Sequence, residues 1–273
     1  MPSAVLVLRE EFRGAALKGT AIELATKNKT GATQIPAEGF LNITYPSYDL
    51  VKALQAIGPH QDRPVVLIGE RGVGKSHLMA ALHHAGADPA ATQAWLAHWA
   101  TTLGQSDLAA IKLRTGMKVI SEKLTSNSYK FLWDLLFDNH PKGEFIRGKW
   151  QADGKRQTNV PSDTLILELL QHQPVMLLLD EFQTWFDGQT EAPSKPQRTW
   201  AFNFIQNLTE IAKNHPELLV LVISVRNGKT DAYQQVRRVA PLEIDFNSVK
   251  SKADRRRLLL HRLFENRING LYP

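Results

Sequence analysis

One short glycine-containing segment constrains this chain more than any other feature of its sequence. Residues 69–76 read GERGVGKS, which satisfies the pattern G-x-x-x-x-G-K-[ST] at each specified position. The apolar run Pro64–Ile68 before it predicts a short buried strand. After it, Leu78, Met79 and Leu82 predict one apolar face of a helix. This order of strand, glycine loop and helix predicts a phosphate-binding loop, and it disfavours the alternative of an ordinary strand-to-helix turn followed by an exposed lysine.

The residue types of this loop match what a phosphate group requires. Gly72 and Gly74 permit backbone angles that a residue with a Cβ resists, so several N–H groups can point into one concavity. The helix N-terminus that follows adds unpaired N–H groups and partial positive charge. Lys75 can reach the β- and γ-phosphates, and the Ser76 hydroxyl can coordinate Mg²⁺. The predicted nucleotide-binding residues are Gly69, Glu70, Arg71, Gly72, Val73, Gly74, Lys75, Ser76 and His77.

A second apolar run ends in two acids. Val175–Leu179 is followed directly by Asp180 and Glu181. Because polar residues do not alternate along this run, we expect a parallel strand that is buried on both faces and ends at the ligand-binding edge of a sheet. Asp180 is expected to hold Mg²⁺ through its water shell, and Glu181 to orient and polarise a water in line with the γ-phosphate. This pairing favours phosphate hydrolysis, the alternative being two acids that merely end a strand at the solvent.

The remaining hydrophobic patterns predict the fold. Ser47 and Asp163 are the expected N-caps of two helices. Further strands are expected at 117–120, 218–225 and 242–246, and helices at 47–57, 92–103, 129–137, 163–170, 200–213, 231–238 and 252–267. Such alternation predicts an α/β fold with three layers, in which a mostly parallel central sheet lies between helices.

Composition excludes several classes of protein and site. The chain has 273 residues, of which 43% are hydrophobic and 22% charged, as is ordinary for a soluble globular protein. It has no cysteine, which excludes disulfides, thiolate metal sites and a cysteine nucleophile. No apolar run is long enough to cross a membrane and no signal peptide is evident, so a cytoplasmic location is expected. The net charge of +6 leaves room for DNA or another acidic partner, although solvated basic faces are the more ordinary explanation.

These motifs together resemble the AAA+ branch of P-loop ATPases, in which a glutamate stands beside the strand-end aspartate. The resemblance implies that Ser224 is the polar sensor residue, with Asn227 as the alternative. It also implies that Arg238, or else Arg237, is an arginine finger, ordinary surface arginines being the alternative. The expected catalytic residues are Glu181, Lys75, Ser224 and Arg238, and the expected metal-binding residues are Ser76 and Asp180.

A closer resemblance covers almost the whole chain. Segments such as LLLDEFQTWFDG (177–188) and ISVRNGKTDAYQQV (223–236) are similar to the N-terminal ATPase part of large bacterial proteins encoded beside DNA methylases in phage-defence islands, including BREX-like systems. The resemblance implies ATP as the nucleotide, Mg²⁺ as the metal and other defence proteins as partners. It also implies a DNA-directed complex and leaves open both direct DNA contact and assembly into a homo-oligomer.

The sequence pattern and the AAA+ resemblance together suggest how the chain is divided. Residues 1–46 are expected to form an N-terminal arm, 47–250 the ATPase core with a surface insertion at about 142–158, and 251–273 the start of a C-terminal lid. Because the similar proteins are several times longer, we expect a fragment or truncated product that lacks a second sensor arginine. The leading hypothesis is an ATPase that acts on a protein–DNA complex. The alternatives are a nucleotide-gated switch or scaffold with negligible turnover, and a DNA-binding module.

Overall fold

A five-stranded parallel sheet forms the centre of the chain. The computed structural model describes residues 6–9, 24, 31–126, 129, 131–153, 160–189 and 195–265. The strands are β1 (Val65–Ile68), β2 (Lys118–Lys123), β3 (Val175–Asp180), β4 (Leu219–Val225) and β5 (Leu242–Asp245). Their order in the sheet is β2-β3-β4-β1-β5, and every neighbouring pair is parallel. The predicted α/β class with a parallel central sheet is confirmed.

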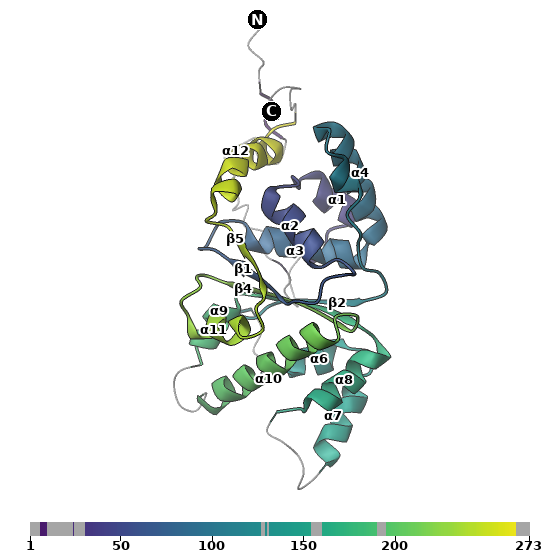
Figure 1. Cartoon of the computed structure of the whole chain (residues 1–273), viewed down its shortest axis with the longest axis vertical. Helices are drawn as coiled ribbons and strands as arrows, with labels where there is room; N and C mark the ends of the chain where they lie inside the picture. Colours follow the sequence, from purple (N-terminus) through teal and green to yellow (C-terminus); the bar gives the residue numbers. More distant parts are fainter. Residues whose placement is uncertain are drawn as a thin grey trace, which may run out of the picture.

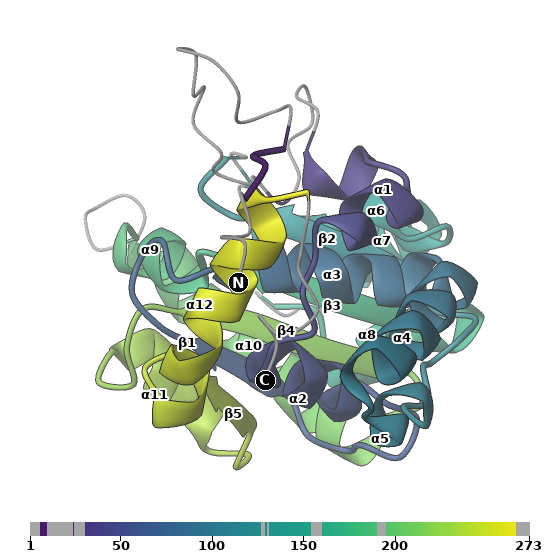
Figure 2. The same ribbon diagram turned by 90° about the horizontal axis from the view of Figure 1, so that it is seen from above.

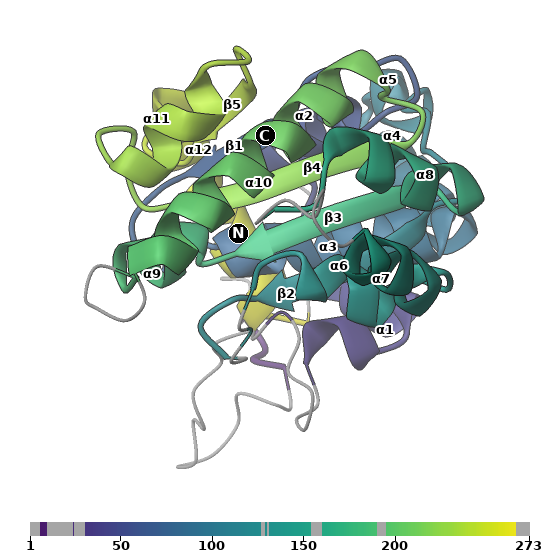
Figure 3. The same ribbon diagram turned by 90° about the horizontal axis from the view of Figure 1, so that it is seen from below.

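Helices cover both faces of this sheet, as Figure 1 shows. One face is covered by α1 (Ala37–Asn42), α2 (Tyr48–Ala56), α3 (Lys75–Ala87), α4 (Pro89–Leu103) and the short α5 (Ser106–Ala109). The other is covered by α6 (Asp134–Asn139), α7 (Gly143–Ala152), α8 (Asp163–His172), α9 (Phe182–Asp187), α10 (Lys195–Asn214) and α11 (Asp231–Arg237), of which α10 crosses the view in Figure 3. A short 3₁₀ helix, η2 (Ala32–Gln34), also packs on the first face.

The strand side chains explain why the sheet needs two helical layers. All residues of β1, β3 and β4 are buried. Within β3, Leu177 and Leu179 join the core on the α10 side, whereas Met176 and Leu178 join the core on the α3 side. A strand that is apolar on both faces loses the hydrophobic stabilisation of one face unless helices cover it.

The last described helix, α12 (Val249–Leu263), lies on the α2 and α3 side of the sheet, as Figures 1 and 2 show. Buried His261 attaches it to the core. One ring nitrogen, Nε2, lies 3.0 Å from the carbonyl oxygen of Asn42, and the ring centroid lies 5.0 Å from that of Trp99. The end of α12 also pairs with the N-terminal segment, since the Arg9 N–H donates to the Leu263 carbonyl at 2.9 Å.

Two local expectations were wrong. The predicted helix at 129–137 begins only at Asp134. The ring of Phe131 stacks on that of Trp133 at a centroid distance of 4.7 Å, and residues two apart do not face each other on a helix. The N-cap of α8 is Ser162 rather than Asp163, because the Ser162 hydroxyl accepts the hydrogen bond from the Leu165 N–H. Ser47 caps α2 as predicted.

Parts of the expected arm and insertion pack into the core. Within 1–46, the side chains of Phe40 and Leu41 are buried against α3 and α4. Within the expected insertion, α7 buries Ile146 and packs Trp150 against the core, one helical turn apart. Residues 154–159 of the insertion and 266–273 of the expected lid lie outside the described residues. The domain boundaries stay a prediction.

Candidate functional site

The glycine loop between β1 and α3 has the backbone geometry that its sequence predicts. Gly72 has φ +80° and Gly74 φ +104°, which are left-handed values that a side chain disfavours. Gly74 is the N-cap of α3, so the first turn of that helix begins in the loop itself. The unpaired N–H groups of this turn therefore face the same space as the loop.

Lys75 folds back over the loop. Its Nζ donates to the carbonyl oxygens of Gly69 at 2.5 Å and Glu70 at 2.9 Å. Burial lowers the pKa of Lys75, while the nearby Asp180 acts in the opposite direction. An anion in the loop would replace these neutral carbonyl partners with charged oxygens and so stabilise the protonated ammonium.

Asp180 connects the loop to the sheet. It ends β3, is 1% exposed, and accepts a hydrogen bond of 2.6 Å on each carboxylate oxygen: from the Ser76 hydroxyl on Oδ2 and from the Ser224 hydroxyl on Oδ1. The N–H of Glu181 donates to the same Oδ1 and to Ser224 Oγ, both at 2.9 Å. The first turn of α3 and the carboxyl ends of β3 and β4 thus meet in one hydrogen-bonded cluster.

Glu181 holds an uncommon backbone conformation. Its φ of 56° and ψ of 29° lie in the left-handed region. Among the described residues that carry a side chain, only Ala240 also has a positive φ. Such angles in a residue with a side chain cost free energy and need support from the surroundings. The two hydrogen bonds of the Glu181 N–H supply that support. Its carboxylate accepts a short hydrogen bond from the Thr125 hydroxyl and lies 4.0 Å from the Lys123 ammonium.

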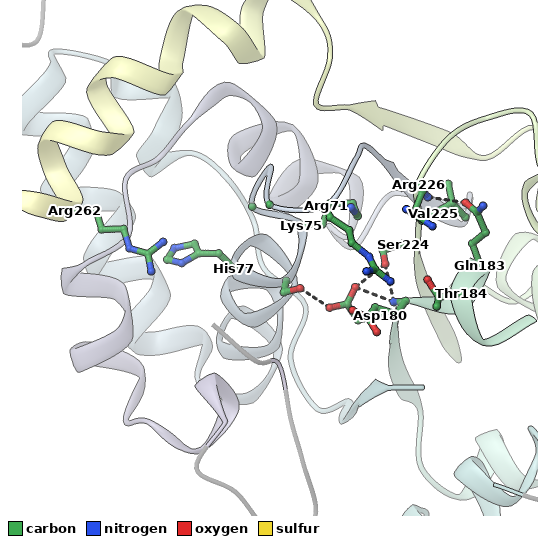
Figure 4. Close-up of a pocket in the computed structure, with 14 residues that line it drawn as sticks. Arg71, Lys75, His77, Asp180, Gln183, Thr184, Ser224, Val225, Arg226 and Arg262 are labelled. Carbon is green, nitrogen blue, oxygen red and sulfur yellow. Dashed lines mark hydrogen bonds between the residues drawn. The ribbon is translucent and has the colours of Figure 1, made fainter. Parts of the chain in front are cut away.

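A cavity of about 420 Å³ joins these groups. Figure 4 shows its labelled lining residues around Asp180, with His77 and Arg262 on the far side of the loop. The lining residues are Arg71, Gly72, Gly74, Lys75, Ser76, His77, Asp180, Glu181, Gln183, Thr184, Ser224, Val225, Arg226 and Arg262. Four of them are Arg or Lys and two are acids, so the cavity favours a negatively charged ligand.

His77 forms the wall of the cavity nearest α12. Its Nε2 lies 3.0 Å from Thr44 Oγ1, and its ring centroid lies 4.8 Å from that of Phe40. Burial lowers the pKa of His77 to about 3, and the nearby Arg262 and His261 act in the same direction. His77 is therefore a neutral ring at neutral pH, and Arg262 brings a positive charge from α12 to the same wall.

The structure brings most of the expected site residues together. Of the predicted nucleotide-binding residues, Arg71, Gly72, Gly74, Lys75, Ser76 and His77 line the cavity. Gly69 and Glu70 contribute carbonyl oxygens to Lys75, and Val73 packs on the core. Ser224 lies in the cavity wall, whereas its alternative Asn227 does not line it and accepts from the Lys229 N–H at 3.0 Å.

The expected arginine finger lies elsewhere. Arg238 follows the end of α11, and its guanidinium carbon lies 5.7 Å from the ring centroid of Phe202 on α10. Neither Arg238 nor Arg237 lines the cavity of its own chain. The role of Arg238 as an arginine finger stays a prediction.

Sequence reasoning missed five lining residues: Gln183, Thr184, Val225, Arg226 and Arg262. Arg226 carried a usable signal, because it follows Ser224 by two residues at the carboxyl end of a buried strand, where ligands bind in parallel sheets. Gln183 and Thr184 lie on the first turn of α9, directly after the two acids. Nothing in the local sequence indicates that Arg262 lies here, because its place depends on how α12 packs.

The donor set fits Mg²⁺. Ser76 Oγ and Asp180 Oδ2 lie 2.6 Å apart, so two oxygens are directed to one point of the cavity wall, and Mg²⁺ prefers oxygen ligands. Within the described ranges, no group of three or more His, Asp or Glu residues could hold a metal by itself. Mg²⁺ in nucleotide sites is commonly bound through one or two protein oxygens together with phosphates and water.

Comparisons with known proteins give little beyond this geometry. The chain matches no protein-family model and no curated protein. Among solved structures it is similar to AMPPCP-bound DnaA from Aquifex aeolicus, with 15% sequence identity and a TM-score of 0.33. That match covers 82% of this chain and 53% of the DnaA chain, so the chain spans about half the length of that protein.

None of the described helices is both long and apolar enough for a membrane crossing.

Proposed function

We propose that this chain binds ATP with Mg²⁺ in the cavity at the glycine loop and hydrolyses it. One observation carries the proposal: the Asp180 carboxylate receives the Ser76 hydroxyl from the phosphate-binding loop and the Ser224 hydroxyl from the neighbouring strand. The loop, the acids and the polar strand end were predicted separately, and their convergence in one cationic cavity is what phosphate hydrolysis requires.

Each side chain has a distinct task in this proposal. The N–H groups of the loop and of the first turn of α3 bind the phosphates, and Lys75 exchanges its carbonyl partners for phosphate oxygens. Ser76 and Asp180 would hold Mg²⁺, which supplies charge neutralisation on the phosphates. Glu181 orients the attacking water and accepts its proton, while Ser224 fixes Asp180 and the Glu181 backbone.

We further propose that the ATPase belongs to the AAA+ branch and serves a cytoplasmic, DNA-directed phage-defence complex. Support comes from the resemblance of residues 177–188 and 223–236 to defence-island ATPases and from the glutamate that follows Asp180. Partners of this kind include other defence proteins, DNA and further copies of the chain. Phage plating on cells that carry the complete defence locus, with and without Lys75→Ala, tests this role: equal plating on both strains would contradict it.

Nucleotide titration and turnover measurements test the biochemical proposal. Lys75→Ala should weaken ATP binding by at least about tenfold, because the loop loses the ammonium that we assign to the terminal phosphates. Glu181→Gln should keep ATP binding and lose Mg²⁺-dependent turnover. Glu38→Gln, which removes an exposed carboxylate on α1, is the matched control and should leave both unchanged. Wild-type protein that binds no ATP would sink the proposal.

A second candidate function is a nucleotide-gated switch with negligible turnover. It is favoured by the contacts of Glu181, whose carboxylate is engaged by Thr125 and lies 4.0 Å from the Lys123 ammonium. If these contacts persist when nucleotide is bound, both carboxylate oxygens stay engaged and Glu181 does not polarise a water. ATP-dependent assembly that is unchanged by Glu181→Gln, together with absent turnover in wild-type protein, would favour the switch. Turnover that rises in Thr125→Val would instead indicate an ATPase whose base is restrained.

A further inference from the structure

Arg226 is the one cavity-lining arginine that comes from the carboxyl end of a core strand. It follows β4 directly, two residues after Ser224. Its backbone N–H donates to Gln183 Oε1 at 2.8 Å. Gln183 is itself 6% exposed, and its Nε2 donates to Asp187 Oδ2 at 3.2 Å. The backbone at Arg226 is therefore fixed by a buried amide, so its side chain starts from a defined point beside the acids.

The guanidinium of Arg226 has no acidic partner in the part of the chain that the structure describes. No ion pair or side-chain hydrogen bond of this group occurs there, although Asp180 and Glu181 line the same cavity. The side chains of Lys75 and Arg226 both line this cavity, and within the described residues neither forms an ion pair, so an anionic ligand between them is favoured.

We infer that Arg226 contacts the terminal phosphate of the bound nucleotide from within the same chain and is a further catalytic residue. The inference rests on the proposed ATPase function and adds the source of its arginine. Arg238, which the resemblance favours for this role, lies over Phe202 and does not reach the cavity of its own chain. Arg226 already lines that cavity, so hydrolysis would need no arginine from a second copy.

The chemical task of Arg226 is electrostatic. Water adds to the γ-phosphorus, the bond from that phosphorus to the β–γ bridging oxygen breaks, and the proton of the water passes through Glu181 to the phosphate product. ADP and inorganic phosphate then leave. Negative charge shifts onto the bridging oxygen during bond cleavage, and a guanidinium beside the phosphate stabilises it without changing its own protonation.

Turnover and binding measurements on purified protein test the inference. Arg226→Ala should lower kcat by about 10³-fold or more, the range found for arginines that act on transferring phosphates. It should leave ADP affinity within about twofold of wild type, while the preference for the non-hydrolysable analogue AMPPNP over ADP is lost. Arg226→Lys should recover only part of kcat, because an ammonium lacks the planar fork. Lys229→Ala removes an exposed cation from the same loop and is the matched control.

A mixing experiment decides whether Arg226 acts within its own chain. Arg226→Ala retains Glu181, and Glu181→Gln retains Arg226. If Arg226 acts on its own site, the mixture stays inactive; restored turnover would overturn the inference. A kcat of Arg226→Ala within threefold of the wild-type value would also overturn the inference. If wild type shows no turnover, an Arg226→Ala variant that keeps the preference for AMPPNP over ADP would overturn it instead. Wild-type protein that binds neither ADP nor AMPPNP would instead refute the proposed function itself.

Discussion

Replacing Ser224 with alanine should destabilise the folded chain by about 2 kcal/mol. The Ser224 hydroxyl is 1% exposed, donates to Asp180 Oδ1 at 2.6 Å and accepts from the Glu181 N–H at 2.9 Å. A hydrogen bond to a charged group contributes about 1.5–3 kcal/mol to stability. The Glu181 N–H would still donate to Asp180 Oδ1, so the loss of its hydrogen bond to Ser224 adds little to the destabilisation. The cost is therefore mainly that of one missing donor to a buried carboxylate.

Urea unfolding followed by tryptophan fluorescence measures this free energy for wild type and variant under the same conditions. The expected result is a lower transition midpoint with an unchanged slope. Ser106→Ala is the control, because Ser106 is exposed as the first residue of α5; it should change stability by less than about 0.5 kcal/mol. A Ser224→Ala variant as stable as this control would refute the bridging role assigned to the hydroxyl.

Three further predictions concern packing, backbone strain and acid sensitivity. Gly86→Ala should destabilise the fold by about 1–2 kcal/mol, because a Cβ there would lie 2.8–2.9 Å from side-chain atoms of β2 and β3; Gly148→Ala on α7 meets nothing within 4 Å and should be neutral or stabilising by up to about 1 kcal/mol, and equal unfolding free energies for the two would contradict this. Gly74→Ala should weaken ATP binding at least about tenfold in a titration, since φ +104° strains any residue with a side chain, and unchanged affinity would show that the loop tolerates it. Burial lowers the pKa of His77 to about 3 and of His261 to about 4, so the unfolded chain binds these protons first as the pH falls below about 6.5. The free energy of unfolding should then fall by about 1–2 kcal/mol per histidine between pH 7 and pH 5, and a flat profile in urea titrations at both pH values would exclude this linkage.

The parts of the site that sequence reasoning placed together are those encoded by adjacent residues. Residues 64–82 combine a buried strand, two glycines with positive φ and the start of a helix that is buried from Leu78 to Leu82, and each depends on its immediate neighbours. The run that ends at Asp180 is apolar at every position, which predicts burial on both faces. Local patterns of this strength leave few alternative folds, so the sheet and the loop could be derived before any contact was known.

Features that depend on side-chain packing were not predictable in this way. The apolar spacing of 129–137 is compatible with a helix, but stacking of Phe131 on Trp133 replaces its first turn. The expected insertion is polar in composition, so its sequence does not indicate that Ile146 of α7 is buried in the core. The contact of Thr125 with Glu181 joins residues 56 positions apart, and no local periodicity reports it.

The strand order explains why Ser224 and Arg226 belong to the site at all. β4 lies between β1 and β3, with Leu67 opposite Ser224 and Ile223 opposite Leu179. Its carboxyl end therefore lies beside both the glycine loop and the acids, and Asp180 accepts one hydrogen bond from each neighbour: from Ser76 at the start of α3 and from Ser224 on β4. If β3 paired directly with β1, no residue of β4 would stand beside Asp180, and a polar residue at 224 would be unnecessary. The same insertion of β4 carries Arg226 to the cavity, so the cation that we assign to the terminal phosphate follows from pairing order rather than from any motif around it.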